Sequence, residues 1–172
     1  MANKHTIIVM ASIIVIIGSL GYSSINAISA HSLEFSWPGS SFNFLSVMTD
    51  KKVNVCNDSV LPATFSKYSI TIFYDGDDLG TFSTGPGGLQ SHTDGVVFGE
   101  FKSKDDRMSG LFFSFLDTET GGTDVTRINA NKIKVVTQLE STILWIIPHT
   151  ITKEYSGSEF LDVINKPTTC EK

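Results

Sequence analysis

The chain has 172 residues, with 13 Lys or Arg against 18 Asp or Glu, so its formal net charge is −5. Because phosphate binding needs clustered basic residues, this balance argues against nucleic acid as a partner, and it also disfavours docking on an anionic membrane surface. The length allows one domain with a core of its own behind an amino-terminal segment.

The amino-terminal segment is apolar and uncharged. No Asp, Glu, Lys or Arg lies between Lys4 and Glu34. A helix over residues 6–28 would rise about 34 Å, enough to cross a hydrocarbon core of about 30 Å with a slight tilt. A cleaved signal peptide is the alternative, but cleavage after Ala27 would put Ile25 three residues before the cut, where a small residue is preferred. We therefore predict a retained signal anchor whose partner is the lipid bilayer.

The basic residues predict the orientation of this anchor. Lys4 is the only one before the apolar run and the next lie well beyond it, so the positive-inside rule keeps residues 1–5 in the cytoplasm. The prediction is a single-pass protein of the cell membrane with an extracytoplasmic body. Within that body we expect a juxtamembrane segment and first strand at 29–41, a folded domain at 42–156 and a tail at 157–172.

Beyond the anchor, apolar and polar residues alternate with the period of a β-strand, and turn residues separate the runs. The expected strands cover residues 33–37, 42–49, 52–56, 65–74, 79–82, 96–101, 125–138, 142–148 and 150–155. In the longest clear run, Tyr68, Ile70, Ile72 and Tyr74 share one face. Pro148 indicates a sheet edge or a bulge, because proline has no backbone donor.

One segment has a helical period instead. Apolar residues recur at i, i+3, i+4, i+7 and i+8 from Met108 to Leu116, and Ser103 with Asp106 supplies a capping-box start. One amphipathic helix at 103–116 among about eight short strands indicates a mostly β chain. The expected fold is an antiparallel β-sandwich with one helix, behind a single transmembrane helix.

Two cysteines, Cys56 and Cys170, fit an oxidising compartment. A disulfide between them would close a very long loop and contribute about 4 to 5 kcal/mol in the chain-entropy model. Two unpaired thiols are the alternative, and the sequence leaves both open because it sets no distance between them. Beside Cys56, the triplet Asn57-Asp58-Ser59 forms a glycosylation sequon in a turn that we expect to be exposed.

A family pattern is carried by two stretches, VNVCNDSVLP at 53–62 and YSITIFYDGDDLG at 68–80. With the order of the elements around them, they resemble the late embryogenesis abundant type 2 domain, also called the water-stress and hypersensitive-response domain, over residues 42–155. The turn residues that match are Asn57, Asp75, Gly76 and Gly80, whereas Asp58 stands where the family usually has proline. The resemblance implies a fibronectin-III-like or immunoglobulin-like sandwich, often behind one membrane helix, and an association with desiccation or osmotic stress. It brings no catalytic residues.

The candidate chemical groups each have a structural explanation. The acidic stretch 75–78 has Pro86 at the twelfth position, where an EF-hand has Glu, so we interpret it as a hairpin turn. His31, His92 and His149 are far apart in sequence and show no metal-ligand spacing. The sequence contains no nucleophile elbow and no phosphate loop. We therefore expect no catalytic residue, no metal and no cofactor.

These observations favour a non-enzymatic, membrane-anchored module that binds a ligand or protects against stress. Its expected partner, besides the bilayer, is an unidentified protein or a polymer of the cell envelope. The alternative is a pilin-like surface subunit that assembles through its apolar helix. Against this alternative, the chain has no basic-plus-glycine cleavage site before the apolar run and no Glu near its start.

Overall fold

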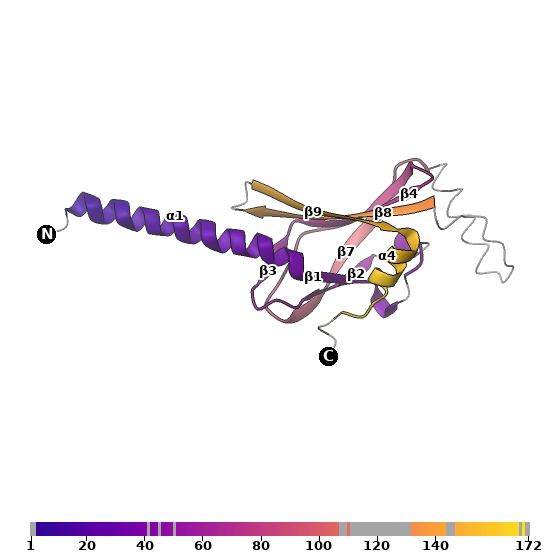
Figure 1. Cartoon of the computed structure of the whole chain (residues 1–172), viewed down its shortest axis with the longest axis horizontal. Coiled ribbons are helices and arrows are strands. Elements are labelled where there is room, and N and C mark those ends of the chain that lie inside the picture. Colours follow the sequence, from indigo (N-terminus) through magenta and orange to yellow (C-terminus); the bar gives the residue numbers. More distant parts are fainter. Residues whose placement is uncertain are drawn as a thin grey trace.

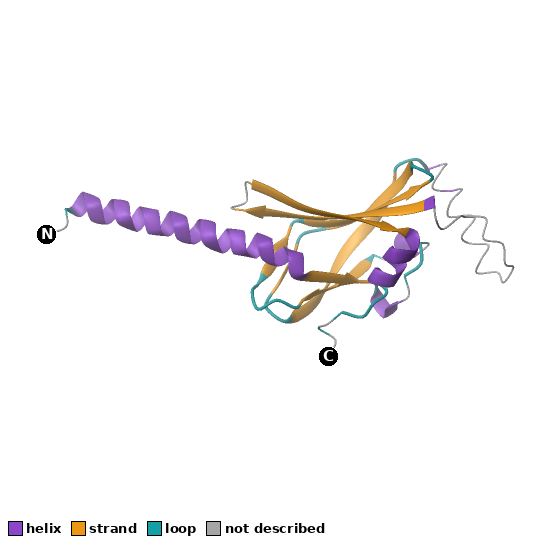
Figure 2. Cartoon of the chain, viewed as in Figure 1, coloured by secondary structure: helices purple, strands orange, loops and turns teal. Residues whose placement is uncertain are grey.

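A long amino-terminal helix leads directly into a mainly β domain (Figures 1 and 2). This computed structural model describes residues 3–40, 42–44, 46–49, 51–106, 110, 132–143, 147–168 and 170. In that part of the chain, helix α1 (Lys4–Ser29) is the one helix whose length and composition allow it to cross a membrane. Its side chains are exposed as far as Tyr22 and become partly buried against the domain from Ser23.

Nine strands build the β domain in the described part of the chain. They are β1 (Leu33–Ser36), β2 (Lys52–Asn57), β3 (Ala63–Phe65), β4 (Lys67–Tyr74), β5 (Asp77–Thr84), β6 (Gly87–Leu89), β7 (Thr93–Ser103), β8 (Ile133–Ile143) and β9 (Ile147–Ser156). Seven of them form one antiparallel sheet in the order β1-β2-β7-β5-β4-β8-β9, and β3 pairs with β6 beside it. The sheet curls, so that its edge strands β1 and β9 border the same cavity.

The sheet turns a corner at Gly99, where strand β7 exchanges one partner for another. Residues 93–98 pair with β2, and residues 99–103 pair with β5. A Cβ at position 99 would lie 2.6 Å from a ring carbon of Phe82 and 2.7 Å from the carbonyl oxygen of Ser83. Glycine is therefore required where the backbone of β7 passes this close to β5.

The core lies inside the curl and is rich in aromatic side chains. Trp37 is 1% exposed and packs edge-on against Phe42 and Phe82, with ring centroids 4.8 and 5.6 Å away. Phe42 in turn meets Phe160 at 5.3 Å. Because each buried ring removes about 150 to 250 Å² from water, this cluster binds the two ends of the β domain to its middle strands.

The segment 29–41, predicted to hold the juxtamembrane segment and first strand, contains strand β1. Strand β1 pairs with β2 along its whole length, and Trp37 directly after it is in the core. Through β1 and Trp37, this segment supplies an edge strand and a core side chain to the β domain.

The predicted tail at 157–172 is corrected to a helix in its first half. Helix α4 (Gly157–Ile164) buries Phe160 and Ile164 against the sheet. It begins with a capping box, in which the Ser156 hydroxyl accepts from the backbone of Glu159 while the Glu159 carboxylate accepts from the backbone of Ser156. This capping signal and the i, i+4 spacing of Phe160 and Ile164 are local features of the sequence that explain why a helix forms here.

The strand predicted at 42–49 is also corrected. Residues 46–49 form the short helix α2 (Ser46–Thr49). The Asn43 side-chain oxygen accepts a hydrogen bond from the Ser46 backbone nitrogen at 2.8 Å, and the Asn43 carbonyl accepts one from the Ser46 hydroxyl at 2.7 Å. Such local bonds compete with strand pairing, so the alternation of buried Phe42 and Phe44 did not continue into a strand.

The other predicted strands agree with the structure to different degrees. Those at 33–37, 52–56, 79–82 and 96–101 are confirmed as β1, β2, β5 and β7, and the run 65–74 divides into β3 and β4. Strands β8 and β9 replace the last three predicted strands, and Pro148 lies in β9, an edge strand as expected. The predicted helix at 103–116 lies mostly outside the described residues, as do residues 125–131.

Candidate functional site

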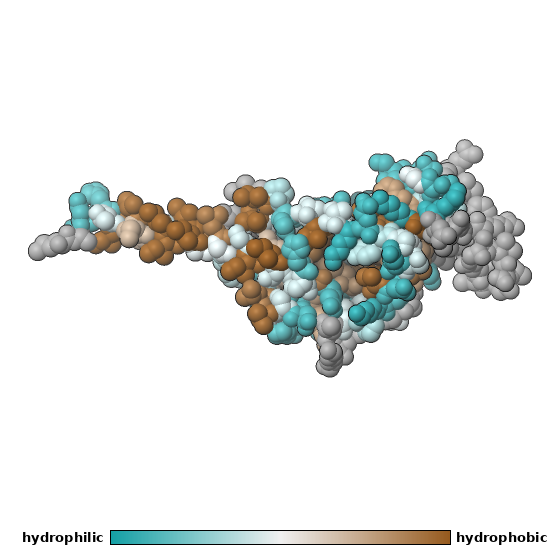
Figure 3. Space-filling view, viewed as in Figure 1, coloured by the Kyte–Doolittle hydropathy of each residue, from teal (hydrophilic) through white to brown (hydrophobic). Residues whose placement is uncertain are grey.

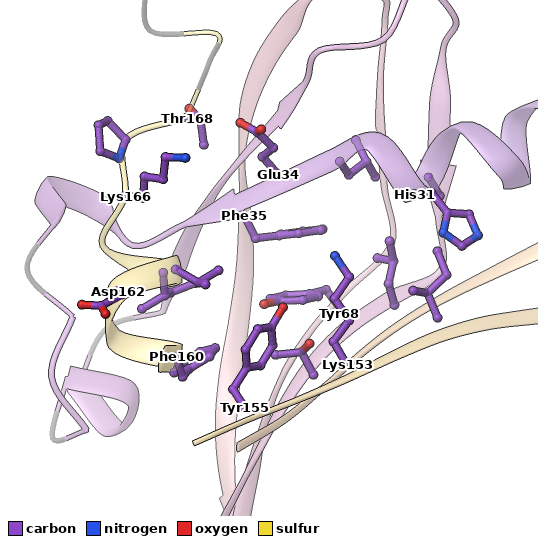
Figure 4. A pocket seen from close by; sticks show the side chains of 18 residues that line it. His31, Glu34, Phe35, Tyr68, Lys153, Tyr155, Phe160, Asp162, Lys166 and Thr168 are labelled. Atoms are coloured by element: carbon purple, nitrogen blue, oxygen red, sulfur yellow. The ribbon is translucent and has the colours of Figure 1, made fainter. Parts of the chain in front are cut away.

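A cavity of about 480 Å³ lies between the two edge strands of the curled sheet (Figure 4). Its walls come from β1, β4, β8, β9, helix α4 and the segment 166–168 that follows α4. Ala30 and His31, which directly follow α1, also line it, so the cavity reaches the base of the helix. Its volume is within the range of about 300 to 1,000 Å³ that is typical of small-molecule sites.

Aromatic rings form much of the inner surface of this cavity. Figure 4 shows Phe35, Tyr68 and Tyr155, which line it from three different strands. Phe35 stacks on Tyr68, with ring centroids 3.8 Å apart and planes inclined by 7°. The ring centroid of Phe160 in α4 lies 5.9 Å from that of Tyr155. The aliphatic part of the lining comes from Leu33, Leu139, Ile151, Val163 and Ile164.

Both tyrosine hydroxyls of the cavity are held in their neutral form. Burial, with a smaller contribution from Tyr155, raises the pKa of Tyr68 far above its usual value. Partial burial also raises the pKa of Tyr155, although a hydrogen bond with Thr137 acts in the opposite direction. Near neutral pH these hydroxyls are hydrogen-bonding groups for a ligand, not phenolate bases or nucleophiles.

Charged side chains line the rim of the cavity. Glu34, Lys153, Asp162 and Lys166 are all exposed there. Two of these side chains are cations and two are anions, so together they favour neither a positively nor a negatively charged ligand. An apolar interior with a polar mouth suits an amphipathic molecule.

A disulfide joins Cys56 of β2 to Cys170 and ties down one wall of the cavity. The two cysteines are 114 residues apart in sequence, and their Cα atoms are 5.8 Å apart. The wall residues 166–168 lie between α4 and Cys170, so the bond holds the far end of this segment on the sheet. The sequence leaves open whether the two cysteines form a disulfide or remain as thiols, and in the structure they form the disulfide.

Asn57 is a structural residue, which corrects its interpretation as an exposed glycosylation site. Its side chain is 0% exposed. The amide nitrogen donates to the carbonyl oxygens of Leu61 and Gln90 at 2.8 and 2.9 Å, and the amide oxygen accepts from the Ser59 backbone and hydroxyl at 3.1 and 2.8 Å. A glycan on the amide nitrogen would have to displace these bonds.

Within the acidic stretch at 75–78, Asp75 and Gly76 form the turn between β4 and β5, and Asp77 begins β5. Asp75 has φ 53° and Gly76 has φ 95°, the left-handed region that tight hairpin turns use. The Asp75 carboxylate accepts a hydrogen bond from the Lys132 amine at 2.6 Å. Gly80 (φ 147°) is a place of close approach, since a Cβ there would lie 2.5 Å from the carbonyl oxygen of Lys102. Among the described residues, no group of three or more His, Cys, Asp or Glu is placed to hold a metal ion.

The fold brings His31 and His149 into contact, which the sequence does not indicate. Their Nε2 atoms are 3.3 Å apart, although the residues are 118 positions apart in sequence. His31 lies in the short helix η1 (Ala30–Ser32) after α1, and His149 lies in edge strand β9, so the pair joins the base of the helix to the sheet. His92 lies elsewhere, 4.0 Å from Asp58. Residues this distant leave no local pattern, so only the fold reveals the pair.

The fold and the cavity define a class, a β domain with an apolar amino-terminal helix and a pocket of small-molecule size. A scan against protein-family models finds no match to the chain, and a search of curated proteins finds no match either. The function is therefore argued from the residues of the cavity and from its position.

Proposed function

We propose that the protein is a membrane-anchored, extracytoplasmic binding module that holds an amphipathic small molecule in the cavity between β1 and β9. Helix α1 crosses the cell membrane, with residues 1–5 in the cytoplasm. The observation that carries the proposal is the aromatic-lined cavity of about 480 Å³, whose wall begins at Ala30 and His31 directly after the helix. This continuity places the ligand site close to the membrane surface.

The chemistry of the lining supports a ligand with an apolar body and a polar end. The body would pack against Phe35, Tyr155 and the aliphatic wall. The polar end would meet the exposed charges at the mouth, of which Lys153 and Lys166 are the cations. Because their pKa values are raised, the tyrosine hydroxyls stay neutral near pH 7 and could donate hydrogen bonds to the polar groups of a ligand or accept them from those groups.

The proposal includes a finer description of the fold as a sandwich. One layer consists of β1, β2 and the first half of β7, and the other consists of the second half of β7 with β5, β4, β8 and β9. Trp37 directly follows β1 of the first layer, and Phe82 belongs to β5 of the second layer. Their rings meet in the core. This arrangement supports the fibronectin-III-like sandwich that the resemblance to the late embryogenesis abundant type 2 domain implies.

The binding site can be tested by photochemical labelling of the full chain in phospholipid nanodiscs. A fatty acid that carries a diazirine on its chain is the probe, and mass spectrometry locates the adducts. We expect adducts on cavity residues such as Tyr155, and at least a tenfold loss of them in Ile151→Trp, which fills the cavity. Thr152→Trp is the matched control, because Thr152 is exposed on the same strand. Labelling that is spread over the surface, or that Ile151→Trp leaves unchanged, would overturn the proposal.

By the same resemblance, we propose a role in the response to desiccation or osmotic stress. Cells that lack the protein should recover less well than the parent strain after drying or exposure to high osmolarity. Equal recovery would count against the stress role and would leave the binding site to be judged by the labelling experiment.

A further inference from the structure

The part of α1 that stands free of the domain matches the thickness of a bilayer. Tyr22 is 64% exposed, whereas the side chains from Ser23 onward begin to pack on the domain. With residues 1–5 in the cytoplasm, the helix from Thr6 to Tyr22 rises about 26 Å at 1.5 Å per residue, close to a hydrocarbon core of about 30 Å. If this part spans the core, the domain meets the membrane at the level of Ser23.

Two parts of the β domain lie near the base of the helix, the connection before β3 and the start of β9. The carboxyl-terminal part of α1 contacts β3 and β8. The connection before β3 contains Val60 and Leu61, whose side chains are 75% and 43% exposed. The first residue of β9 is Ile147, which is 52% exposed and pairs with Ile143, the last residue of β8. Figure 1 shows the paired ends of β8 and β9 pointing toward the helix, and Figure 3 shows hydrophobic surface around the base of the helix.

These side chains and those of Ile25 and Ile28 are exposed apolar groups near the base of the helix, and we call the set the apolar collar. It consists of Ile25, Ile28, Val60, Leu61 and Ile147. Large apolar side chains that gather on an exposed surface mark a place of contact with a partner or a membrane. The opposite end of the sheet is different, because the β4–β5 turn there is made of Asp75, Gly76 and Asp77.

We propose that the apolar collar inserts into the outer leaflet of the membrane, so that Val60, Leu61 and Ile147 together with the helix hold the β domain on the lipid surface. This inference rests on the proposed crossing of the membrane by α1. Lipid is the occupant because Ile25 and Ile28 belong both to the collar and to α1, whose exposed apolar run lies directly before them in the same helix. Apolar insertion needs no anionic lipid, which agrees with the net charge of −5.

The consequence is a fixed orientation of the domain. A domain held only by a helix can tilt, whereas three lipid contacts set the angle between the sheet and the membrane. His31 and Ala30 then keep one side of the cavity at the height of the lipid headgroups. A ligand could pass between the cavity and the lipid surface without crossing a long path through water.

Fluorescent labels at single introduced cysteines test the inference in the full chain, reconstituted in phosphatidylcholine vesicles. The label is an environment-sensitive dye, and the quencher is a lipid with a nitroxide near the top of its acyl chain. The positions are Val60→Cys and Ile147→Cys in the collar, Asp77→Cys at the far end as the matched exposed control, and Ile14→Cys in the middle of α1. Labelling under non-reducing conditions leaves the native disulfide in place.

We expect at least twofold quenching at Val60 and Ile147 and none at Asp77. If both collar positions behave like Asp77 while a nitroxide deep in the acyl chain quenches Ile14, the collar is overturned and the membrane anchor stands. If Ile14 also stays unquenched, the anchor fails and the inference fails with it. Collar labels that are shielded from water but not quenched by lipid nitroxides would show a second copy on this surface and would overturn lipid insertion.

Discussion

The ring of Phe35 in edge strand β1 stacks on the ring of Tyr68 in β4, with centroids 3.8 Å apart and planes inclined by 7°. The two strands are not neighbours in the sheet, so the stack joins parts of the curl that no backbone hydrogen bond connects. It also forms part of the inner surface of the cavity. Packing of the core and shape of the candidate site therefore depend on the same two rings.

Replacement of Phe35 by Ala should destabilise the fold by about 2 to 4 kcal/mol, somewhat below the range for a fully buried Phe, because Phe35 is only partly buried. Urea unfolding of the detergent-solubilised chain measures the change. Phe35→Leu is the control, since it keeps much of the apolar contact and should cost less than half as much. A loss below about 0.5 kcal/mol in the Ala variant would show that the stack contributes little.

The buried tyrosine predicts a specific sensitivity to alkali. Because the pKa of Tyr68 is raised in the folded state, unfolding above the ordinary tyrosine pKa of about 10 releases a proton. Its stabilising contribution is complete below pH 10 and should fall by up to about 1.4 kcal/mol per pH unit above it. Thermal unfolding from pH 8 to 11 measures this slope.

Tyr68→Phe separates this effect from general alkaline unfolding. The variant should keep the stacked ring. Its free energy of unfolding should fall less steeply above pH 10, by up to about 1.4 kcal/mol per pH unit, while the smaller contribution of Tyr155 remains. An identical alkaline decline in the variant and the natural chain would contradict the assignment to Tyr68.

The disulfide should stabilise the fold and hold the cavity wall. In the chain-entropy model, a bond across 114 residues contributes about 4 to 5 kcal/mol, so the double replacement of Cys56 and Cys170 by Ala should lower the free energy of unfolding by roughly this amount. Limited proteolysis should then cut near Lys166 before the β domain is digested. Equal stability with and without the bond, and an uncut carboxyl segment, would contradict both roles.

Asn57 should be sensitive to small changes, because its buried side-chain amide forms hydrogen bonds with four residues, Ser59, Leu61, Leu89 and Gln90. Asn57→Ala should cost about 2 to 4 kcal/mol, since it leaves carbonyl groups without their donor. Asn57→Asp keeps the oxygen that accepts from Ser59 and loses the donors, so it separates the two sets of bonds. Chemical denaturation compares the variants. Stability like that of the natural chain in both would show that the network is replaceable.

Features that depend on a single segment can be predicted from the sequence, whereas features that depend on contacts between distant segments cannot. The apolar run and the alternation in 68–74 each report one segment's environment, so they predicted α1 and the buried face of β4. The capping-box pair Ser156 and Glu159, followed by Phe160, is an equally local signal and accounts for helix α4 within the predicted tail. The cavity, by contrast, needs β1 and β9 to meet through the curl of the sheet, and the contact of His31 with His149 depends on the same closure.

Protease treatment of intact cells, followed by mass measurement of the fragment left in the membrane, tests the anchored extracytoplasmic domain most directly. We predict that external protease removes the β domain and leaves a membrane-bound fragment that begins at the amino terminus and ends near residue 30. A full-length chain in the soluble fraction, or a β domain that becomes sensitive only after the cells are lysed, would contradict the account.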